Sequence, residues 1–174
     1  MGDVTLDKVN ALPDFLTDER FEIAFSKMPA VSGITSDEIN LRTVTFKPPK
    51  ATLAKVTATL HSFAKSQPAA RQPEESITIT LIETIDAKTF QFIKDWRDIC
   101  VARNTHKVGN VSDREAELLV YHKDNQNRSV WNYKIIKAWL QDYDIPEFTD
   151  GSSPAAVQST ITLAYSDFID GKRV

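Results

Sequence analysis

The chain has 174 residues, a length that suits one domain over residues 1–174. Hydrophobic residues make up 41% and charged residues 26%, which allows a buried core under a soluble surface. The net charge of -3 does not by itself indicate nucleic-acid binding, and the single cysteine excludes an intramolecular disulfide. No apolar run approaches the roughly 18 residues of a membrane helix, and the acidic N-terminal region lacks the apolar segment of a signal peptide.

Charge is distributed unevenly along the chain. Residues 1–38 carry eight acidic and three basic residues, a net charge of -5. Residues 39–73 carry six basic residues and no acidic one, and residues 74–174 carry sixteen acidic and twelve basic residues. The basic block is interpreted as a solvated loop or hairpin, as an arm that docks on an acidic face of an identical neighbour, or, with the weakest support, as a nucleic-acid contact.

The N-terminal part predicts two strands. We expect residues 1–19 to be a lead-in, flexible or docked. The alternation of apolar and polar residues over 20–25 predicts a half-buried strand, and residues 41–47 predict a second one. Pro48 and Pro49 end the second strand, because proline cannot donate to a β ladder.

A basic arm or loop is expected over residues 39–75. Residues 51–65 contain helix-favouring Ala, Leu and Lys, but β-branched Val56 and Thr57 favour an extended arm or half of a hairpin. Residues 66–75 hold two prolines and many polar residues, which predicts a loop. The strict alternation over residues 76–82 predicts the clearest strand of the chain.

One helix is expected, from about Ala87 to Arg103. The carboxylate of Asp86 is placed to accept a hydrogen bond from a free N–H group of the first turn. Helical spacing joins the apolar residues Phe90, Phe92, Ile93, Trp96, Ile99 and Cys100 into one stripe. A single broad apolar stripe indicates that the helix covers a sheet or plugs the end of a barrel.

The C-terminal part predicts three further strands. A strand near Leu118 leads into the polar turn 123–128, and the long strand 130–140 follows. After a loop over 141–156, residues 157–165 alternate as a last strand. The predicted fold class is therefore mainly β (α+β). We expect an antiparallel β-barrel or sandwich with one flanking α-helix and an extended hairpin or loop arm.

The long strand is partly apolar on both faces. One face carries Trp131, Tyr133, Ile135, Lys137 and Trp139. The aromatic residues could form a stacking platform for bases or sugars. The preferred interpretation is that one face packs into the core and the other meets a neighbouring subunit or the helix.

No residue pattern indicates catalysis, a cofactor or a metal. His61, His106 and His122 form no metal-ligand spacing. Cys100 and His106 could be imagined as nucleophile and base, but Cys100 lies on the apolar helix stripe, where a buried thiol is expected. The carboxylates of the loop after the long strand do not follow the EF-hand pattern and are interpreted as a solvated connection or a subunit contact: Asp142, Asp144, Glu147 and Asp150.

The order and spacing of these elements over about residues 20–168 resemble the tail tube proteins of contractile-tailed bacteriophages. The most specific part is the tryptophan-bearing strand 130–140, the loop with Ile145-Pro146 and the final strand Thr160–Tyr165. The resemblance implies a small β-barrel or sandwich with a flanking helix. It also implies hexameric rings that stack into the inner tube of a contractile tail, through which DNA passes during ejection.

The resemblance further implies a structural virion protein, assembled in the host cytoplasm, with tail sheath, baseplate and tail terminator proteins as partners and no membrane contact. DNA would pass through a neutral-to-acidic lumen without specific binding. The basic block would be the hairpin or loop that meets the next ring. The expected inter-subunit contacts are Arg42, Lys47, Lys50, Lys55, Trp131 and Tyr133. A baseplate tube initiator and a tube protein of an injection or type VI secretion system are alternatives, as is, from another class, a β-barrel module that binds a ligand or nucleic acid.

Overall fold

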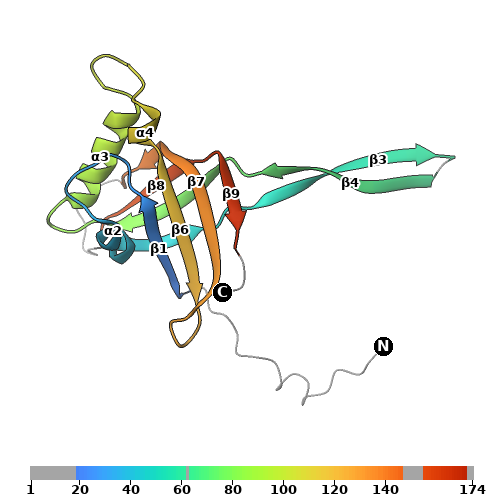
Figure 1. The fold of residues 1–174 in the computed structure, drawn as a ribbon, viewed down its shortest axis with the longest axis horizontal. Coiled ribbons are helices and arrows are strands. Elements are labelled where there is room, and N and C mark those ends of the chain that lie inside the picture. Colours follow the sequence, from blue (N-terminus) through green and yellow to red (C-terminus); the bar gives the residue numbers. More distant parts are fainter. Residues whose placement is uncertain (1–18, 62, 147–154, 172–174) are drawn as a thin grey trace.

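The computed structural model describes residues 19–61, 63–146 and 155–171, which form a β-rich body with a long projecting hairpin (Figure 1). The predicted lead-in lies outside these ranges except for Glu19. No helix among the described residues is long and apolar enough to span a membrane. The strands are β1 (Phe21–Lys27), β2 (Thr43–Lys47), β3 (Ala51–Leu60), β4 (Phe63–Pro73), β5 (Ser76–Ile82), β6 (Ala116–Lys123), β7 (Ser129–Asp144), β8 (Gln158–Ala164) and β9 (Asp167–Asp170). The helices are α2 (Ser36–Arg42), α3 (Lys88–Cys100) and α4 (Val111–Arg114).

The body is built from antiparallel strands that run in the order β1-β6-β7-β8-β5-β2, with β9 paired to β7. Strand β7 belongs to two sheets: its first part pairs with β6 and β9, and its last part pairs with β8. We call β1-β6-β7-β9 the first sheet and β7-β8-β5-β2 the second sheet. The mainly β prediction is confirmed as a sandwich-like arrangement, whereas the closed-barrel alternative is wrong for the described part of the chain.

A β-bulge marks the place where β7 passes from one sheet to the other. Ala138 pairs with Ala116 and Ile135 with Leu118, so β7 holds one residue more than β6 between these pairs. Lys137 has a φ of 54°, and Ile135 and Ala138 are both fully buried. The prediction that Trp131 and Trp139 share a face is therefore wrong, because the extra residue reverses the alternation between them.

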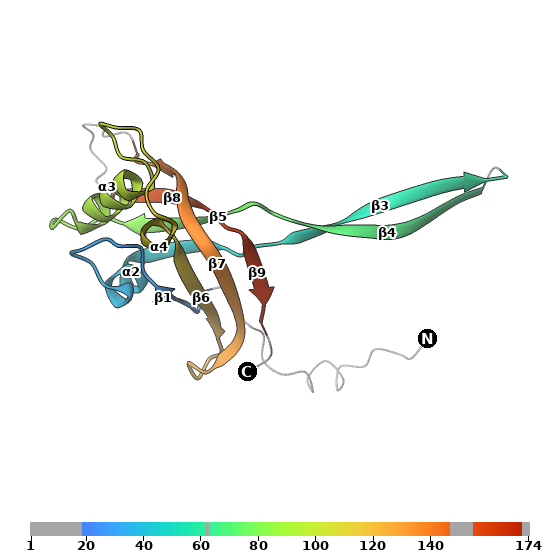
Figure 2. The same cartoon turned by 45° about the horizontal axis from the view of Figure 1, so that its top comes forward.

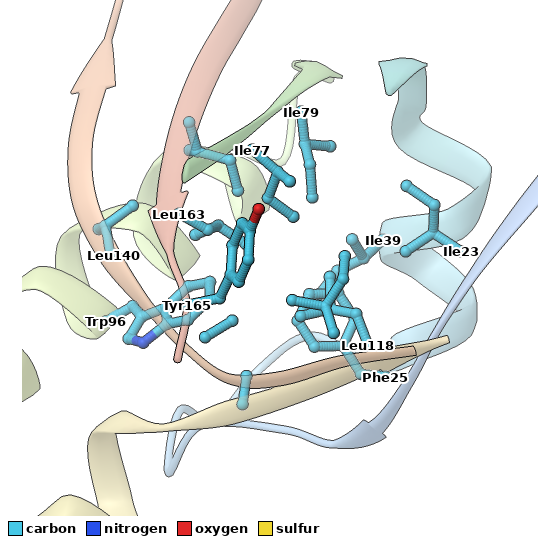
Figure 3. Packing of buried hydrophobic residues seen from close by; sticks show 14 of the residues in the cluster. Ile23, Phe25, Ile39, Ile77, Ile79, Trp96, Leu118, Leu140, Leu163 and Tyr165 are labelled. Atoms are coloured by element: carbon cyan, nitrogen blue, oxygen red, sulfur yellow. The ribbon is translucent and has the colours of Figure 1, made fainter. Parts of the chain in front are cut away.

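The core lies between the two sheets and is closed at one end by α3, as Figure 3 shows for its central residues. Trp96 of α3 is fully buried and its indole Nε1 donates a hydrogen bond of 2.8 Å to the carbonyl of Arg114. Its ring lies 5.4 Å from Phe92 and 6.3 Å from Phe25, measured between centroids. The apolar helix stripe predicted from sequence thus packs on the sheets.

The start of α3 differs from the prediction. Ala87, with a left-handed φ of 53°, is the N-cap residue and makes no side-chain cap. The carboxylate of Glu83 accepts from the backbone N–H groups of Thr89 and Phe90, at 3.3 and 2.7 Å. Asp86 does accept from Lys88 N at 3.3 Å, but its carboxylate is oriented mainly by other partners described below.

Helix α2 was not expected from sequence, and neither was the single turn α4. A capping box starts α2: Thr35 Oγ1 accepts from Glu38 N at 3.3 Å, and Glu38 Oε2 accepts from Thr35 N at 2.9 Å. The helix lies along β1, where Asn40 Oδ1 accepts from Ile23 N and Ser36 Oγ accepts from Phe25 N, both at 2.8 Å. Backbone donors on the edge of β1 that faces away from β6 are thereby satisfied.

Candidate assembly interface

Strands β3 and β4 form a two-stranded hairpin, here called the arm, that extends away from the body (Figures 1 and 2). Its pairing runs from Ala51 opposite Pro73 to Leu60 opposite Phe63. The extended reading of residues 51–65 is confirmed, but the loop predicted over 66–75 is wrong. Prolines are tolerated in β4 because each strand of a two-stranded ribbon has an unpaired edge, where a missing N–H costs no ladder bond.

One face of the outer arm exposes large apolar side chains. Thr57 and Ser66 lie opposite each other and their hydroxyl groups are 3.0 Å apart. Adjacent positions point to the other face, which carries Val56, Ala58 and Phe63 together with Lys65 and Gln67. Val56 is 50% exposed and Phe63 is 80% exposed. A two-stranded ribbon has no core of its own and is marginally stable in water, and exposed apolar side chains on it are suited to contact with a partner.

The root of the arm is fixed to the body by charged side chains. The guanidinium carbon of Arg71 lies 4.9 Å from the centre of the Phe168 ring, and Arg71 Nη2 lies 3.4 Å from a carboxylate oxygen of Asp170. Lys47 Nζ pairs with Glu74 Oε1 at 2.9 Å. Strand β9 therefore holds β4, and the end of β2 holds the residue that follows the arm.

Among the expected contact residues, Arg42 is occupied within the subunit. Its guanidinium pairs with Asp86 at 2.9 Å and with Glu83 at 3.5 Å, and its side chain is 12% exposed. The hydroxyl of Thr84 and then Arg42 hold the pKa of Asp86 down at about 2. This group of residues ties the end of α2 to the loop before α3.

The other expected contacts remain predictions, and their positions are as follows. Lys50 lies between β2 and the arm, and its carbonyl accepts from Glu74 N at 2.8 Å. Lys55 is exposed on the arm. Trp131 is 36% exposed, and its ring meets Tyr133 edge-on at 6.4 Å between centroids. Both aromatic residues share the face of the buried Ile135, and Tyr133 is half-buried and packs against the core.

The outer face of the second sheet is lined by threonines. Thr78 pairs with Thr162 and Thr80 pairs with Thr160, while the residues between them are buried in the core. The hydroxyl oxygens of Thr80 and Thr160 are 3.4 Å apart. On β7, Asp142 and Asp144 extend the same rows, opposite Thr162 and Thr160, and both are exposed. This face is uncharged at its centre and acidic at its β7 side, while at its β2 side Lys47 stands opposite Thr78 and pairs with Glu74. Sequence reasoning identified the strands but not this surface, although the repeated Thr at alternate positions was its signal.

The described residues hold no arrangement with an evident chemistry. No group of three His, Cys, Asp or Glu side chains in this part of the chain could hold a metal ion. Cys100 is buried, and burial raises the pKa of its thiol, which disfavours the reactive thiolate. The loop predicted to begin at residue 141 is wrong for Asp142 and Asp144, which belong to β7, and its other acidic residues, Glu147 and Asp150, lie outside the described ranges. The features that stand out are therefore surfaces.

Comparisons with known proteins rest on structure. No protein-family model matches this chain, and no curated protein matches its sequence. A chain from the six-fold symmetrised baseplate of the anti-feeding prophage is similar, with a TM-score of 0.61 and 13% identity, covering 91% of this chain and 97% of that chain. A chain from the tube-terminating cap of the same particle has a TM-score of 0.62 and 14% identity, covering 94% and 95%.

A third similar chain comes from the sheath-tube complex of the PVC extracellular contractile injection system in its extended state. Its TM-score is 0.57 at 14% identity, and the similarity covers 99% of this chain and 100% of that chain. These similarities extend over nearly the whole of each chain, and at such low identity they concern the fold. The resemblance seen in the sequence is confirmed at that level: this protein has the fold of tube and tube-terminator proteins of contractile injection systems.

Proposed function

We propose that this protein is a structural subunit of the inner tube of a contractile phage tail or a related injection system, without enzymatic activity. The observation that carries the proposal is the arm, a ribbon with exposed Val56 and Phe63 and no core to cover them. Such a surface is suited to association with another subunit. The shared fold supports the tube as the assembly in question.

In this proposal the subunits form hexameric rings that stack into a tube, and sheath, baseplate and terminator proteins are its partners. The six-fold symmetry of the similar baseplate supports the ring size. Charge supports association between identical copies, because residues 51–73 of the arm carry Lys55, Lys65 and Arg71 and no acidic residue, whereas the whole chain has a net charge of -3. Opposite charges on two surfaces favour their encounter and fix their register.

We further propose that the threonine-lined face of the second sheet lines the lumen and lets DNA pass. Short hydroxyl side chains such as Thr78 and Thr160 place no positive charge against phosphates, and Asp142 and Asp144 repel them. The basic residue at the β2 side of this face, Lys47, is paired with Glu74. A conduit for DNA needs such weak contact with its cargo. In a phage, the assembled particle would be the virion.

Negative-stain microscopy of the purified full chain tests the assembly. We expect rings or hollow tubes from the wild type and from the control Thr57→Ser on the polar face of the arm. The double variant V56S/F63S removes the exposed apolar surface without touching the core, and we expect it to stay monomeric with an unchanged unfolding midpoint. A wild-type chain that remains a monomer at high concentration, with a small molecule or nucleic acid bound, would favour the binding-module alternative and contradict the proposal.

A further inference from the structure

Large apolar side chains are also exposed on the body, at the junction of α2 and the loop before α3. Leu41 is 84% exposed and Ile85 is fully exposed. Leu41 precedes Arg42, and Ile85 stands between Thr84 and Asp86, the two residues to which Arg42 donates hydrogen bonds of 2.6 and 2.9 Å. The ion-pair network therefore brings the segments of both apolar residues together. We call this surface, residues 36–42 and 83–88, the α2–α3 patch.

The α2–α3 patch and the arm lie at opposite ends of the molecule. Figures 1 and 2 both show the arm projecting from one side of the body, with α2 and the loop between β5 and α3 at the far side. Strand β3 has ten residues, so the arm extends by about 33 Å and reaches well beyond its own body. The arm of one subunit cannot fold back on its own α2–α3 patch, but it can reach the patch of another copy.

Charge favours this patch over the exposed apolar surface around the bridge between Val101 and Val108, which are 45% and 64% exposed. Residues 101–111 carry Arg103 and Lys107 and no acidic residue, so they repel the basic arm. The α2–α3 patch has four acidic residues and two basic ones, a net charge of -2, which attracts it.

We propose that the apolar face of the arm, with Val56 and Phe63, docks on the α2–α3 patch of a second copy of this chain, around Leu41 and Ile85. This inference rests on the proposed tube function and adds the receiving surface to it. The contact joins two different surfaces of the same protein. A docked pair therefore still has one free arm, on the receiving copy, and one free patch, on the other copy. A heterologous contact of this kind continues from copy to copy and builds an open, polar assembly.

Site-specific disulfide formation tests the contact in assembled tubes. Two single-cysteine additions, Phe63→Cys and Ile85→Cys, are mixed in equal amounts, assembled and oxidised, and covalent dimers are measured on a non-reducing gel. We expect dimers from the mixture and few from either variant alone. The native Cys100 is buried and serves as the background in the wild type. The matched control mixes Phe63→Cys with Val108→Cys, which places the second thiol on the basic patch, and we expect no dimers.

The outcomes separate this inference from the proposed function. Tubes that form normally but give no 63–85 dimer, or that give the 63–108 dimer equally well, overturn the docking site and leave the tube function standing. A charge exchange provides a second measurement: K65E should weaken assembly several-fold, and adding D37K in the same chain should restore it. Lack of restoration, together with missing dimers, rules the α2–α3 patch out. A wild-type chain that never assembles contradicts both proposals.

Discussion

Arg71 lies over the ring of Phe168 with its guanidinium carbon 4.9 Å from the ring centre. The two residues come from β4 and β9, so the contact joins the arm to the edge of the first sheet. A cation over an aromatic face at an exposed site contributes about 0.5–1 kcal/mol, and an exposed ion pair such as Arg71–Asp170 contributes up to about 1 kcal/mol. These contributions are small beside the stability of the body, but they act where the arm leaves it.

We therefore expect Arg71→Ala to loosen the arm without unfolding the body. Backbone amides of residues 69–72 should exchange hydrogen faster, while those of α3 should keep their protection. Arg71→Lys should give an intermediate result, because lysine keeps the charge and loses the planar group that stacks on the ring. Hydrogen exchange measured by mass spectrometry checks this, with Lys65→Ala as the control. Equal exchange rates in Arg71→Ala and wild type would show that the root is held by other contacts.

Lys137 provides a test of the bulge in β7. A left-handed conformation costs a residue with a Cβ roughly 1–2 kcal/mol, and glycine avoids this cost. We expect Lys137→Gly to raise the free energy of unfolding by up to about 1 kcal/mol, after the higher entropy of glycine in the unfolded chain is counted. Urea denaturation gives the value. Lys134→Gly, three positions earlier in extended backbone, should instead destabilise the protein.

Tyr165 predicts a response to alkaline pH. Burial, and then the charges of Glu74 and Asp167, raise the pKa of its phenol to about 12. Because the folded pKa exceeds the usual value of about 10, stability is fully present below pH 10 and falls as the pH rises towards 12. Tyr165→Phe should remove this part of the loss. At pH 7 it should be neutral or slightly stabilising, because the buried hydroxyl has no partner among the described residues. Urea melts at pH 7 and pH 11 compare the two proteins.

Reversing the basic charges at and beside the root of the arm should impair assembly more than folding. In the triple variant K47E/K50E/K55E, the pair between Lys47 and Glu74 is lost, and like charges face each other there. Since these side chains lie outside the core, the unfolding midpoint should change little, whereas tube yield should fall at least tenfold. Sedimentation and microscopy measure the yield. Normal tubes from this variant would show that basic charge does not guide assembly.

The lumen assignment predicts weak DNA binding by assembled tubes. Filter binding should detect no strong, salt-sensitive retention of DNA by the wild type. The variant T78K/T162K adds two positive charges per subunit to the proposed lumen face and should create retention that disappears as salt rises. Lysines placed at Leu119 and Ala24, which pair on the outer face of the first sheet, serve as controls. Retention by the controls alone would move the lumen to the first sheet.

Several parts of this structure could be read from local sequence patterns. The alternation over residues 76–82 and the apolar stripe of α3 are properties of neighbouring residues, and both elements formed where expected. Helix α2 was missed because its seven residues show no long apolar period, although Thr35 and Glu38 carried a capping-box signal. The prediction that Asp86 caps α3 was wrong because its carboxylate is oriented by Arg42 and Thr84. Arg42 is distant in the sequence, and the nearby hydroxyl of Thr84 was not considered.

Long-range geometry explains the remaining differences. The bulge at Lys137 depends on β7 passing between two sheets. No local sequence pattern predicts that this lysine adopts a left-handed backbone conformation. A loop was expected around Pro68 because proline is not tolerated in a strand that is paired on both sides. The arm has only two strands, so each of them is paired on one side only. The candidate interface could be identified only from sequence and fold together. The sequence showed that residues 39–73 are basic. Only the fold shows that Val56 and Phe63 are exposed and that Arg42 pairs with Asp86 and Glu83 within the subunit.

The hydrogen bonds from β1 to Ser36 and Asn40 have a consequence for subunits waiting to assemble. A bare strand edge invites random pairing with any other extended chain. Here part of that edge is closed by side chains of the subunit's own helix, so a pool of unassembled copies has fewer ways to aggregate. Ser36→Ala with Asn40→Ala would reopen it. Faithful polymerisation depends as much on such closed edges as on the surfaces that join.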